Sequence, residues 1–215
     1  DSNQGTNHDA NFKSGKVCRA GNFDGSNYIE IQDHNSLDAD LSKLTLEAWI
    51  YPTSYPDITD KDNPTHSIIC KWQSDPSDRS YCFALGGPTA GAEVLTFAIS
   101  DDGKAPTLGD GSLAGTEPIP LDEWSHVVAV YDETEMKIYI NGELDASLNY
   151  DKGIYNSNVE LRIGSAFKWG HSKYNKPVFF DGKIDEVAIY STALTQSQIQ
   201  QHYANGLAGK GYCYS

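Results

Sequence analysis

Positive charge and long apolar stretches are both scarce in this sequence, and each scarcity excludes a class of partner. Lys and Arg number 16 against 30 Asp and Glu, which gives a formal net charge of −14. Nucleic acids and anionic membranes are bound by basic surfaces, so neither is an expected partner. No apolar run approaches the roughly 18 residues of a membrane-spanning helix, so we expect no membrane insertion. Because the sequence starts at Asp1 with no Met and no segment of signal-peptide character, we expect a mature segment or a module of a longer protein.

Turn-forming and aromatic residues, in contrast, are plentiful. The sequence has 19 Gly, 9 Pro and 13 Tyr, a composition typical of many short strands joined by turns. A hydrophobic content of 39% excludes wholesale disorder. The length of 215 residues fits one domain, because all-β sandwiches reach roughly 250 residues as a single unit.

Apolar segments bounded by turn residues predict about ten strands. They cover residues 27–31, 44–51, 67–72, 81–85, 94–100, 124–132, 136–140, 143–147, 160–163 and 183–190. Asn141-Gly142 predicts a tight hairpin, and Thr195 with Gln198 predicts a capped helix that ends at Asn205-Gly206. Residues 1–17 are expected to be irregular. We therefore predict an all-β, two-sheet antiparallel sandwich with one short C-terminal helix. It forms a single domain over residues 1–215, with a core of about 17–206.

The four cysteines do not form the CxxC spacing of a zinc ribbon or redox site. Cys70 and Cys82 flank a polar stretch that would join two strands, and Cys18 and Cys213 lie near the two chain ends, which often meet in a sandwich. We therefore expect the pairs Cys70–Cys82 and Cys18–Cys213. Disulfides imply an oxidising compartment, so the expected location is secreted or cell-surface. The alternative is four buried free thiols in a cytosolic protein.

Several segments together resemble one family. They are FDG at 23–25, YIEI at 28–31, LEAWI at 46–50, WSHVVAVYD at 124–132, IYING at 138–142, LRIG at 161–164 and GKIDEVAIY at 182–190. In this order they resemble the laminin G-like (concanavalin A-like lectin/glucanase) jelly-roll domains of bacterial extracellular proteins. The resemblance covers roughly residues 17–206. It implies two antiparallel sheets, one of them concave, and a module of a larger extracellular protein such as an enzyme or adhesin.

The same fold includes glycoside hydrolases, so catalytic patterns need to be considered. Retaining hydrolysis uses two carboxyl groups about 5 Å apart, and the sequence has no ExDxE pattern that would supply them from one strand. Asp185 and Glu186 are adjacent and His126 and Tyr131 are five apart, so each pair points to opposite faces of a strand. GxSxG and HExxH are absent from the sequence. We expect no enzymatic activity, and we expect Glu47, Trp49 and His126 to be structural.

Calcium is an expected structural cofactor. The resemblance implies a site that joins Asp24 of the FDG turn to Asp185 of the last strand, with oxygens from Asn22 and Asn27. The alternative is that Asp24 caps its own turn and Asp185 accepts a backbone hydrogen bond. A second acidic group, Asp57, Asp60, Asp62 and Asn63, is expected to be solvated loop charge.

Residues 167–176 have the chemistry of a glycan-binding loop, because aromatic rings can stack on sugars and polar groups can bond hydroxyls. The expected contacts in the loop are Lys168, Trp169, His171, Lys173 and Tyr174. Trp72, Arg79, Tyr81 and Tyr55 are expected to form a neighbouring wall. The basic character of the loop would favour an anionic glycan. The alternative is that Trp169 and Tyr174 cover a sheet edge.

The sequence therefore predicts a non-catalytic carbohydrate-binding module or adhesin lectin domain that binds a polysaccharide. A protein- or peptide-binding laminin G-like module is the alternative, and a glycanase or polysaccharide lyase of the same fold is less favoured.

Overall fold

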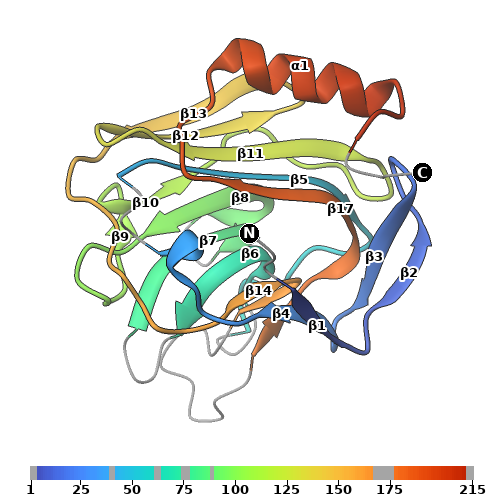
Figure 1. The fold of residues 1–215 in the computed structure, drawn as a ribbon, viewed down its shortest axis with the longest axis horizontal. Helices are drawn as coiled ribbons and strands as arrows, with labels where there is room; N and C mark the ends of the chain where they lie inside the picture. Colours follow the sequence, from blue (N-terminus) through green and yellow to red (C-terminus); the bar gives the residue numbers. More distant parts are fainter. Residues whose placement is uncertain are drawn as a thin grey trace.

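Two large sheets packed face to face form the body of the protein (Figure 1). The computed structural model describes residues 4–38, 42–60, 64–73, 78–87, 90–166 and 177–211. Sheet A has eight strands in the order β1 (Gly5–His8), β4 (Tyr28–Ile31), β14 (Leu161–Ile163), β6 (His66–Gln73), β7 (Asp78–Gly87), β8 (Gly91–Ile99), β10 (Gly111–Ala114) and β9 (Thr107–Leu108). Its neighbouring strands are antiparallel except for the short pair β10 and β9.

Sheet B has seven antiparallel strands. Their order is β13 (Glu143–Asn149), β12 (Glu135–Ile140), β11 (Ser125–Tyr131), β5 (Leu44–Pro52), β17 (Asp181–Tyr190), β3 (Arg19–Asp24) and β2 (Asn11–Ser14). A two-stranded ribbon, β15 (Ser165–Ala166) with β16 (Val178–Phe179), and a short 3₁₀ turn, η1 (Asn35–Leu37), complete the strand-rich part. The sandwich and its C-terminal helix are thus confirmed.

Strand β5 shows why the sequence folds in this way. Leu46, Ala48 and Ile50 alternate along it and point into the core between the sheets. The residues between them, Glu47 and Trp49, are buried as well. Both faces of the strand are therefore covered, one by sheet A and the other by the helix.

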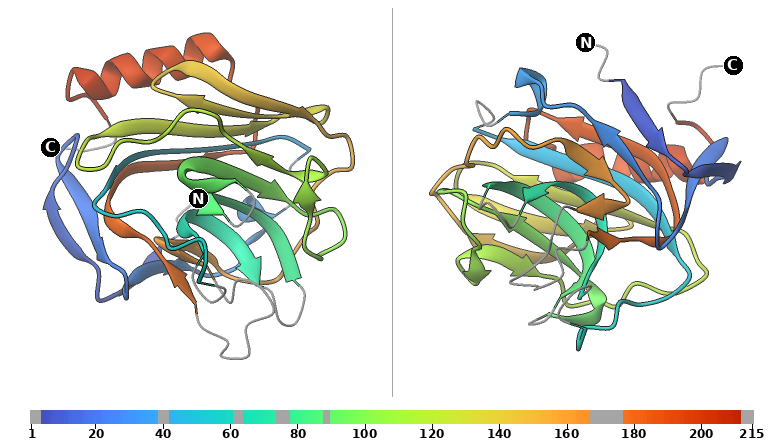
Figure 2. Two further views of the ribbon diagram at one scale, coloured as in Figure 1. Left: turned by 180° about the vertical axis from the view of Figure 1, so that it is seen from behind. Right: turned by 90° about the horizontal axis from the view of Figure 1, so that it is seen from below.

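Helix α1 (Gln196–Leu207) covers the outer face of sheet B (Figures 1 and 2). The Thr195 side chain and the Gln198 side chain form the predicted capping box. Ile199 packs on Val128 and Val130 of β11. The predicted stop at Asn205-Gly206 is wrong by one residue, because the helix continues through Leu207 and Gly206 is buried inside it. This helix is too short to cross a membrane, and none of the described helices qualifies.

The outer face of sheet A is covered in part by the ribbon of β15 and β16. Ala166 and Val178 from this ribbon pack against a small apolar cluster that includes Cys70, Cys82 and Trp72. The Cys70–Cys82 disulfide joins β6 to β7 and is confirmed. Cys18 is not a free cysteine, but its expected partner Cys213 lies outside the described residues, so that pairing stays a prediction.

The N-terminal segment differs from the expectation of an irregular entry. Residues 5–8 form β1 at the edge of sheet A and residues 11–14 form β2 at the edge of sheet B. Both strands are largely exposed and polar, so they carry no apolar alternation that would predict them. Their backbone hydrogen bonds to β4 and β3 stabilise them instead.

Candidate functional site

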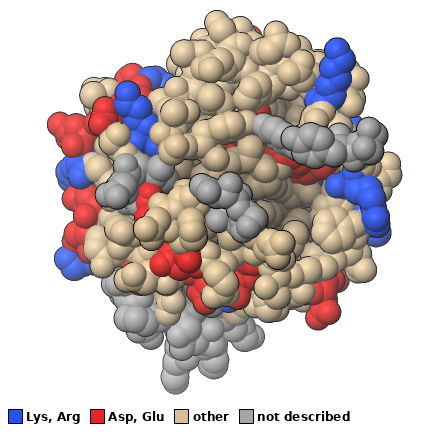
Figure 3. All heavy atoms as spheres, in the orientation of Figure 1, with Lys and Arg blue, Asp and Glu red and all other residues tan. Residues whose placement is uncertain are grey.

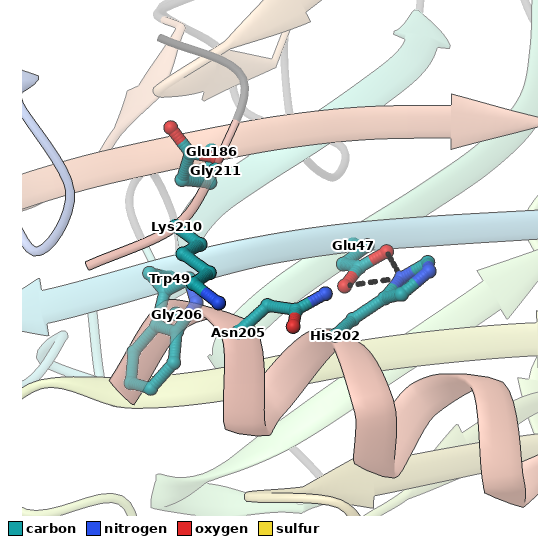
Figure 4. A pocket seen from close by; sticks show the side chains of 8 residues that line it. All are labelled: Glu47, Trp49, Glu186, His202, Asn205, Gly206, Lys210 and Gly211. Carbon is teal, nitrogen blue, oxygen red and sulfur yellow. Dashed lines mark hydrogen bonds and ion pairs between the residues drawn. The ribbon is translucent and has the colours of Figure 1, made fainter. Parts of the chain in front are cut away.

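A cavity of about 250 Å³ lies between helix α1 and the outer face of sheet B (Figure 4). Its walls come from β5, from β17, from the last turns of α1 and from the chain just after the helix. The lining residues are Glu47, Trp49, Glu186, His202, Asn205, Gly206, Lys210 and Gly211.

Glu47 is the central polar group of this cavity. It projects from the outer side of β5, and two histidines hold its carboxylate. His126 Nε2 of β11 lies 2.7 Å from Glu47 Oε1, and His202 Nδ1 of α1 lies 3.0 Å from Oε2 and 3.1 Å from Oε1. The cluster therefore joins β5, β11 and α1.

The two histidines determine the state of the Glu47 carboxyl. His126 Nε2 faces the carboxylate, and its Nδ1 is buried with no partner among the described residues. Burial raises the pKa of the Glu47 carboxyl, but the hydrogen bonds and charges of His126 and His202 outweigh it, and the pKa lies below its usual range. Glu47 is thus ionised at neutral pH.

Trp49 forms the aromatic side of the cavity. Its indole packs against Tyr203 of α1, with ring centroids 5.6 Å apart and an interplanar angle of 23°. The Lys16 ammonium lies 4.7 Å from the Trp49 ring centroid. Gly206 allows this close approach of the helix, because a Cβ atom there would lie 2.5 Å from Trp49 Nε1.

The remaining wall is polar and mixed in charge. Asn205 Oδ1 accepts a hydrogen bond from Gln201, and Figure 4 shows the amide nitrogen of Asn205 directed towards Glu47. Lys210 adds an ammonium group and Glu186 a second carboxylate. The cavity can therefore both donate and accept hydrogen bonds beside an aromatic ring, but its buried carboxylate has no proton to give at neutral pH.

The sequence reasoning expected Glu47 and His126 to be structural and did not identify His202, Asn205 or Lys210. The sequence did contain a signal for His202 and Asn205. His202 lies three residues after Ile199, the residue that anchors the helix, and Asn205 lies three residues further on. Helical spacing therefore places all three near one face of α1.

A second polar cluster occupies the outer face of sheet A. Arg162 Nη2 lies 3.0 Å from Glu30 Oε2, and the guanidinium is 4.3 Å from the Tyr28 ring centroid. His8 stacks on Tyr28, with ring centroids 4.3 Å apart. Phe179 of β16 is a further neighbour of Tyr28, at 6.3 Å. Strand β16, which follows the predicted binding loop in the chain, thus ends beside this cluster.

The predicted glycan contacts in that loop, Lys168, Trp169, His171, Lys173 and Tyr174, lie outside the described residues. The residues of the expected neighbouring wall are described, and the structure corrects the place of Tyr81. Tyr81 is fully buried and its hydroxyl donates to the carbonyl of Leu37. Trp72 and Arg79 are buried too, with the guanidinium 5.6 Å from the indole centroid, so they contribute to the packing of sheet A. Tyr55 is half-buried, and its hydroxyl donates to the carbonyl of Ile119.

The four residues predicted to bind calcium do not come together as one ligand set. Asp24 pairs in register with Asp181, four residues from Asp185, which is about 13 Å along a strand. Asp24 Oδ1 accepts from the backbone and hydroxyl of Ser26. The Asp185 oxygens accept backbone N–H groups of Val17 and Glu186.

The other two predicted ligands are also separated by register, because Asn22 pairs with Lys183 while Asn27 is buried beyond the turn. No group of three or more His, Cys, Asp or Glu that could hold a metal occurs in the described ranges. In the second acidic group, Asp57 caps its own turn through Thr59, Asp60 donates a backbone hydrogen bond to Asp57, and Asp62 and Asn63 lie outside the described residues. We derive no function through calcium, and binding of the ion stays a prediction.

Comparison with known proteins places these features in context. Residues 23–200 match the family model described as the concanavalin A-like lectin/glucanases superfamily. No curated protein sequence matches the chain. The fourth domain of an extracellular arabinanase from Geobacillus stearothermophilus, solved with arabinotriose, has a TM-score of 0.64 at 20% identity over 92% of this chain and 86% of that one.

Two further solved structures share the fold. A candidate carbohydrate-binding protein of Bacteroides ovatus has a TM-score of 0.64 at 22% identity, covering 86% of this chain and 46% of that one. The binding domain of Paraclostridial Mosquitocidal Protein 1 has a TM-score of 0.65 at 16% identity, covering 94% and 47%. The chain thus spans less than half the length of these two proteins, and at such identities the likeness shows a common fold.

Proposed function

Because the chain belongs to the concanavalin A-like lectin/glucanase superfamily, we propose that it is a non-catalytic carbohydrate-binding module, secreted or displayed at the cell surface as part of a larger protein. The arabinotriose complex of a protein with the same fold supports this proposal. The internal disulfide supports an oxidising location.

The observation that carries the proposal is the cavity beneath α1. Ligand pockets for small polar molecules combine an aromatic or apolar wall with a few polar groups that fix orientation. Here the Trp49 ring lies beside the Asn205 amide, the Lys210 ammonium and the Glu47 carboxylate. Sugar hydroxyls both donate and accept hydrogen bonds, so this mixture suits one sugar unit at the end of a glycan.

Charge indicates the kind of sugar. The cavity holds two carboxylates and one ammonium, so a neutral sugar fits it better than an acidic one. On the face drawn in Figure 3, most of the surface is uncharged, and acidic side chains lie at its left edge and across its lower part. The basic loop at 167–176 would instead favour an anionic glycan, and it remains a second, sequence-based candidate for stacking.

The state of Glu47 supports a binding role over hydrolysis. A general acid needs a carboxyl group that keeps its proton near neutral pH. The two histidines lower the pKa of Glu47, and both of its oxygens already accept hydrogen bonds. This carboxylate is therefore suited to positioning α1.

A glycan array tests the proposal. The wild type, Asn205→Ala and Trp169→Ala would be compared, with Lys13→Ala on the exposed strand β2 as matched control. We expect neutral-glycan signals that Asn205→Ala weakens and Lys13→Ala leaves unchanged. Loss of anionic-glycan signals in Trp169→Ala would assign binding to the loop instead. Absence of any wild-type signal contradicts the proposed function, and release of reducing sugar from a bound glycan contradicts its non-catalytic part.

A further inference from the structure

Trp49 is the aromatic wall of the proposed sugar site, yet this residue is only 3% exposed. A sugar that stacks on an indole needs an open face of the ring. The groups that cover Trp49 therefore decide how a sugar can reach it. In the described structure these groups come from two different parts of the fold.

The first cover comes from helix α1 and is fixed in place. Tyr203 stacks on the indole, and Gly206 brings the helix backbone against the Nε1 side of the ring. The helix cannot easily move away, because Ile199 is packed in the apolar cluster on β11 and His202 is hydrogen-bonded to Glu47. A sugar therefore does not gain access to Trp49 from the side of the helix.

The second cover is the side chain of Lys16. Its ammonium lies over the Trp49 ring, 4.7 Å from the centroid. Lys16 belongs to the turn between β2 and β3, which Figures 1 and 2 show near the C-terminal end of α1. The residue is half-buried, and a cation–π contact near the surface is weak. The ammonium sits on a flexible four-carbon stem, so it can leave the ring without any movement of the helix.

The backbone of this turn is anchored, so the movement is confined to the side chain. The Val17 N–H donates to Asp185 Oδ2 of β17 at 2.9 Å. The Gly15 N–H donates to the Cys18 carbonyl at 3.1 Å. A Cβ atom at Gly15 would lie 2.3 Å from Asp185 Oδ2, so the turn lies directly on this carboxylate. The anchored turn returns the Lys16 ammonium to the ring whenever the ring is free.

We infer that Lys16 is a displaceable cover of the sugar site. In the free protein its ammonium occupies the open side of Trp49, and a neutral sugar displaces it in order to stack on the ring. This inference rests on the proposed function and adds an autoinhibitory contact to the same site. Because the sugar replaces a weak cation–π contact, the cover lowers the affinity for the sugar by about two- to fivefold.

Acrylamide quenching of tryptophan fluorescence tests the cover without any glycan. The chain has four Trp, so the measurement is the difference between variants. Lys16→Ala should increase the quenching over that of the wild type, and the increase should vanish in a Trp49→Phe background. Acrylamide is uncharged, so the loss of a lysine charge does not itself change its concentration near the ring. Equal quenching in Lys16→Ala and the wild type overturns the inference.

Two matched controls separate the cover from a general effect of charge. Lys16→Arg keeps a cation at the ring, and Lys13→Ala removes the same charge from the exposed strand β2. Both should be quenched like the wild type. An increase in Lys13→Ala as large as that in Lys16→Ala overturns the inference.

The glycan array, repeated with Lys16→Ala, tests the consequence for binding. Titration of the neutral oligosaccharide with the strongest array signal should give a Kd about two- to fivefold lower in Lys16→Ala than in the wild type. Equal affinity in the two proteins overturns this inference alone and leaves the proposed function intact. Absence of any neutral-glycan signal from both proteins overturns the proposed function and this inference with it.

Discussion

Replacement of Glu47 by alanine should be among the most damaging single changes in this protein. Glu47 and His126 are almost entirely buried, with side chains 5% and 1% exposed. Without the carboxylate, His126 Nε2 loses its acceptor, and Nδ1 already has no partner among the described residues. Leaving a buried hydrogen-bond donor without its acceptor costs about 1–3 kcal/mol, and more when the lost partner was charged. This cost is a substantial part of the roughly 5–15 kcal/mol that stabilises a typical domain.

His202→Ala is the matched comparison, because it removes the other partner of the same carboxylate. The His202 side chain is 30% exposed, so water can replace part of what it supplies, and we expect a loss of only about 1 kcal/mol. The double variant should be little less stable than Glu47→Ala, because both changes remove the same Glu47–His202 contact.

Equilibrium denaturation in guanidinium chloride with the disulfides intact would measure these differences. The midpoint should fall strongly in Glu47→Ala and slightly in His202→Ala, with the slope unchanged. The reasoning is refuted if Glu47→Ala costs less than about 1 kcal/mol, or if the two single variants lose equal stability and their losses add.

Three further predictions follow from the same structure. First, the lowered pKa of Glu47 contributes stability that is present above its unfolded value of about 4.3 and is lost as pH falls through the folded value; acid titration of the denaturation midpoint should therefore be steeper in the wild type than in Glu47→Ala. Second, Cys70→Ala/Cys82→Ala releases a loop closed over 12 residues and should cost about 3 kcal/mol, measured by denaturation against wild type, and an unchanged midpoint would contradict it. Third, Gly206→Ala should lower the melting temperature despite the roughly 1 kcal/mol that alanine gains over glycine in a helix, because the new Cβ meets the Trp49 indole; a stabilised variant would show that the helix shifts freely.

Much of the fold was predictable because alternating apolar residues and turn signals coincide. Leu46, Ala48 and Ile50 mark β5, and Asn141 and Gly142 take the positive φ values of the predicted hairpin turn. The same alternation could also have predicted the direction in which the Tyr81 side chain points. It alternates with Phe83 and Leu85, both core residues, and this spacing indicates an inward side chain instead of the ligand wall that we expected.

The spacing of residues within one segment could not predict which distant segments lie side by side, or in which register. His202 meets Glu47 across 155 residues, and Asp24 pairs with Asp181 instead of lying beside Asp185. The buried ammonium of Lys71 on β6 likewise lies 2.7 Å from Asp33 Oδ1 and 3.3 Å from the Ser157 hydroxyl, which come from different parts of the chain. These contacts are set by which strands become neighbours, and a pattern of period two on a single strand does not encode its neighbours.

The position of β17 has a consequence for how the chain reaches its fold. This strand is the last of the sheet strands to be synthesised, yet it lies inside sheet B, with β5 on one side and β3 on the other. Until residues 181–190 leave the ribosome, β3 and β2 have no connection to the remainder of that sheet, and the core stays open along this line. Folding must therefore wait for contacts between distant parts of the chain, which favours slow folding, in milliseconds to seconds. During synthesis, the exposed edges of β5 and β3 are then the surfaces that most need protection from aggregation.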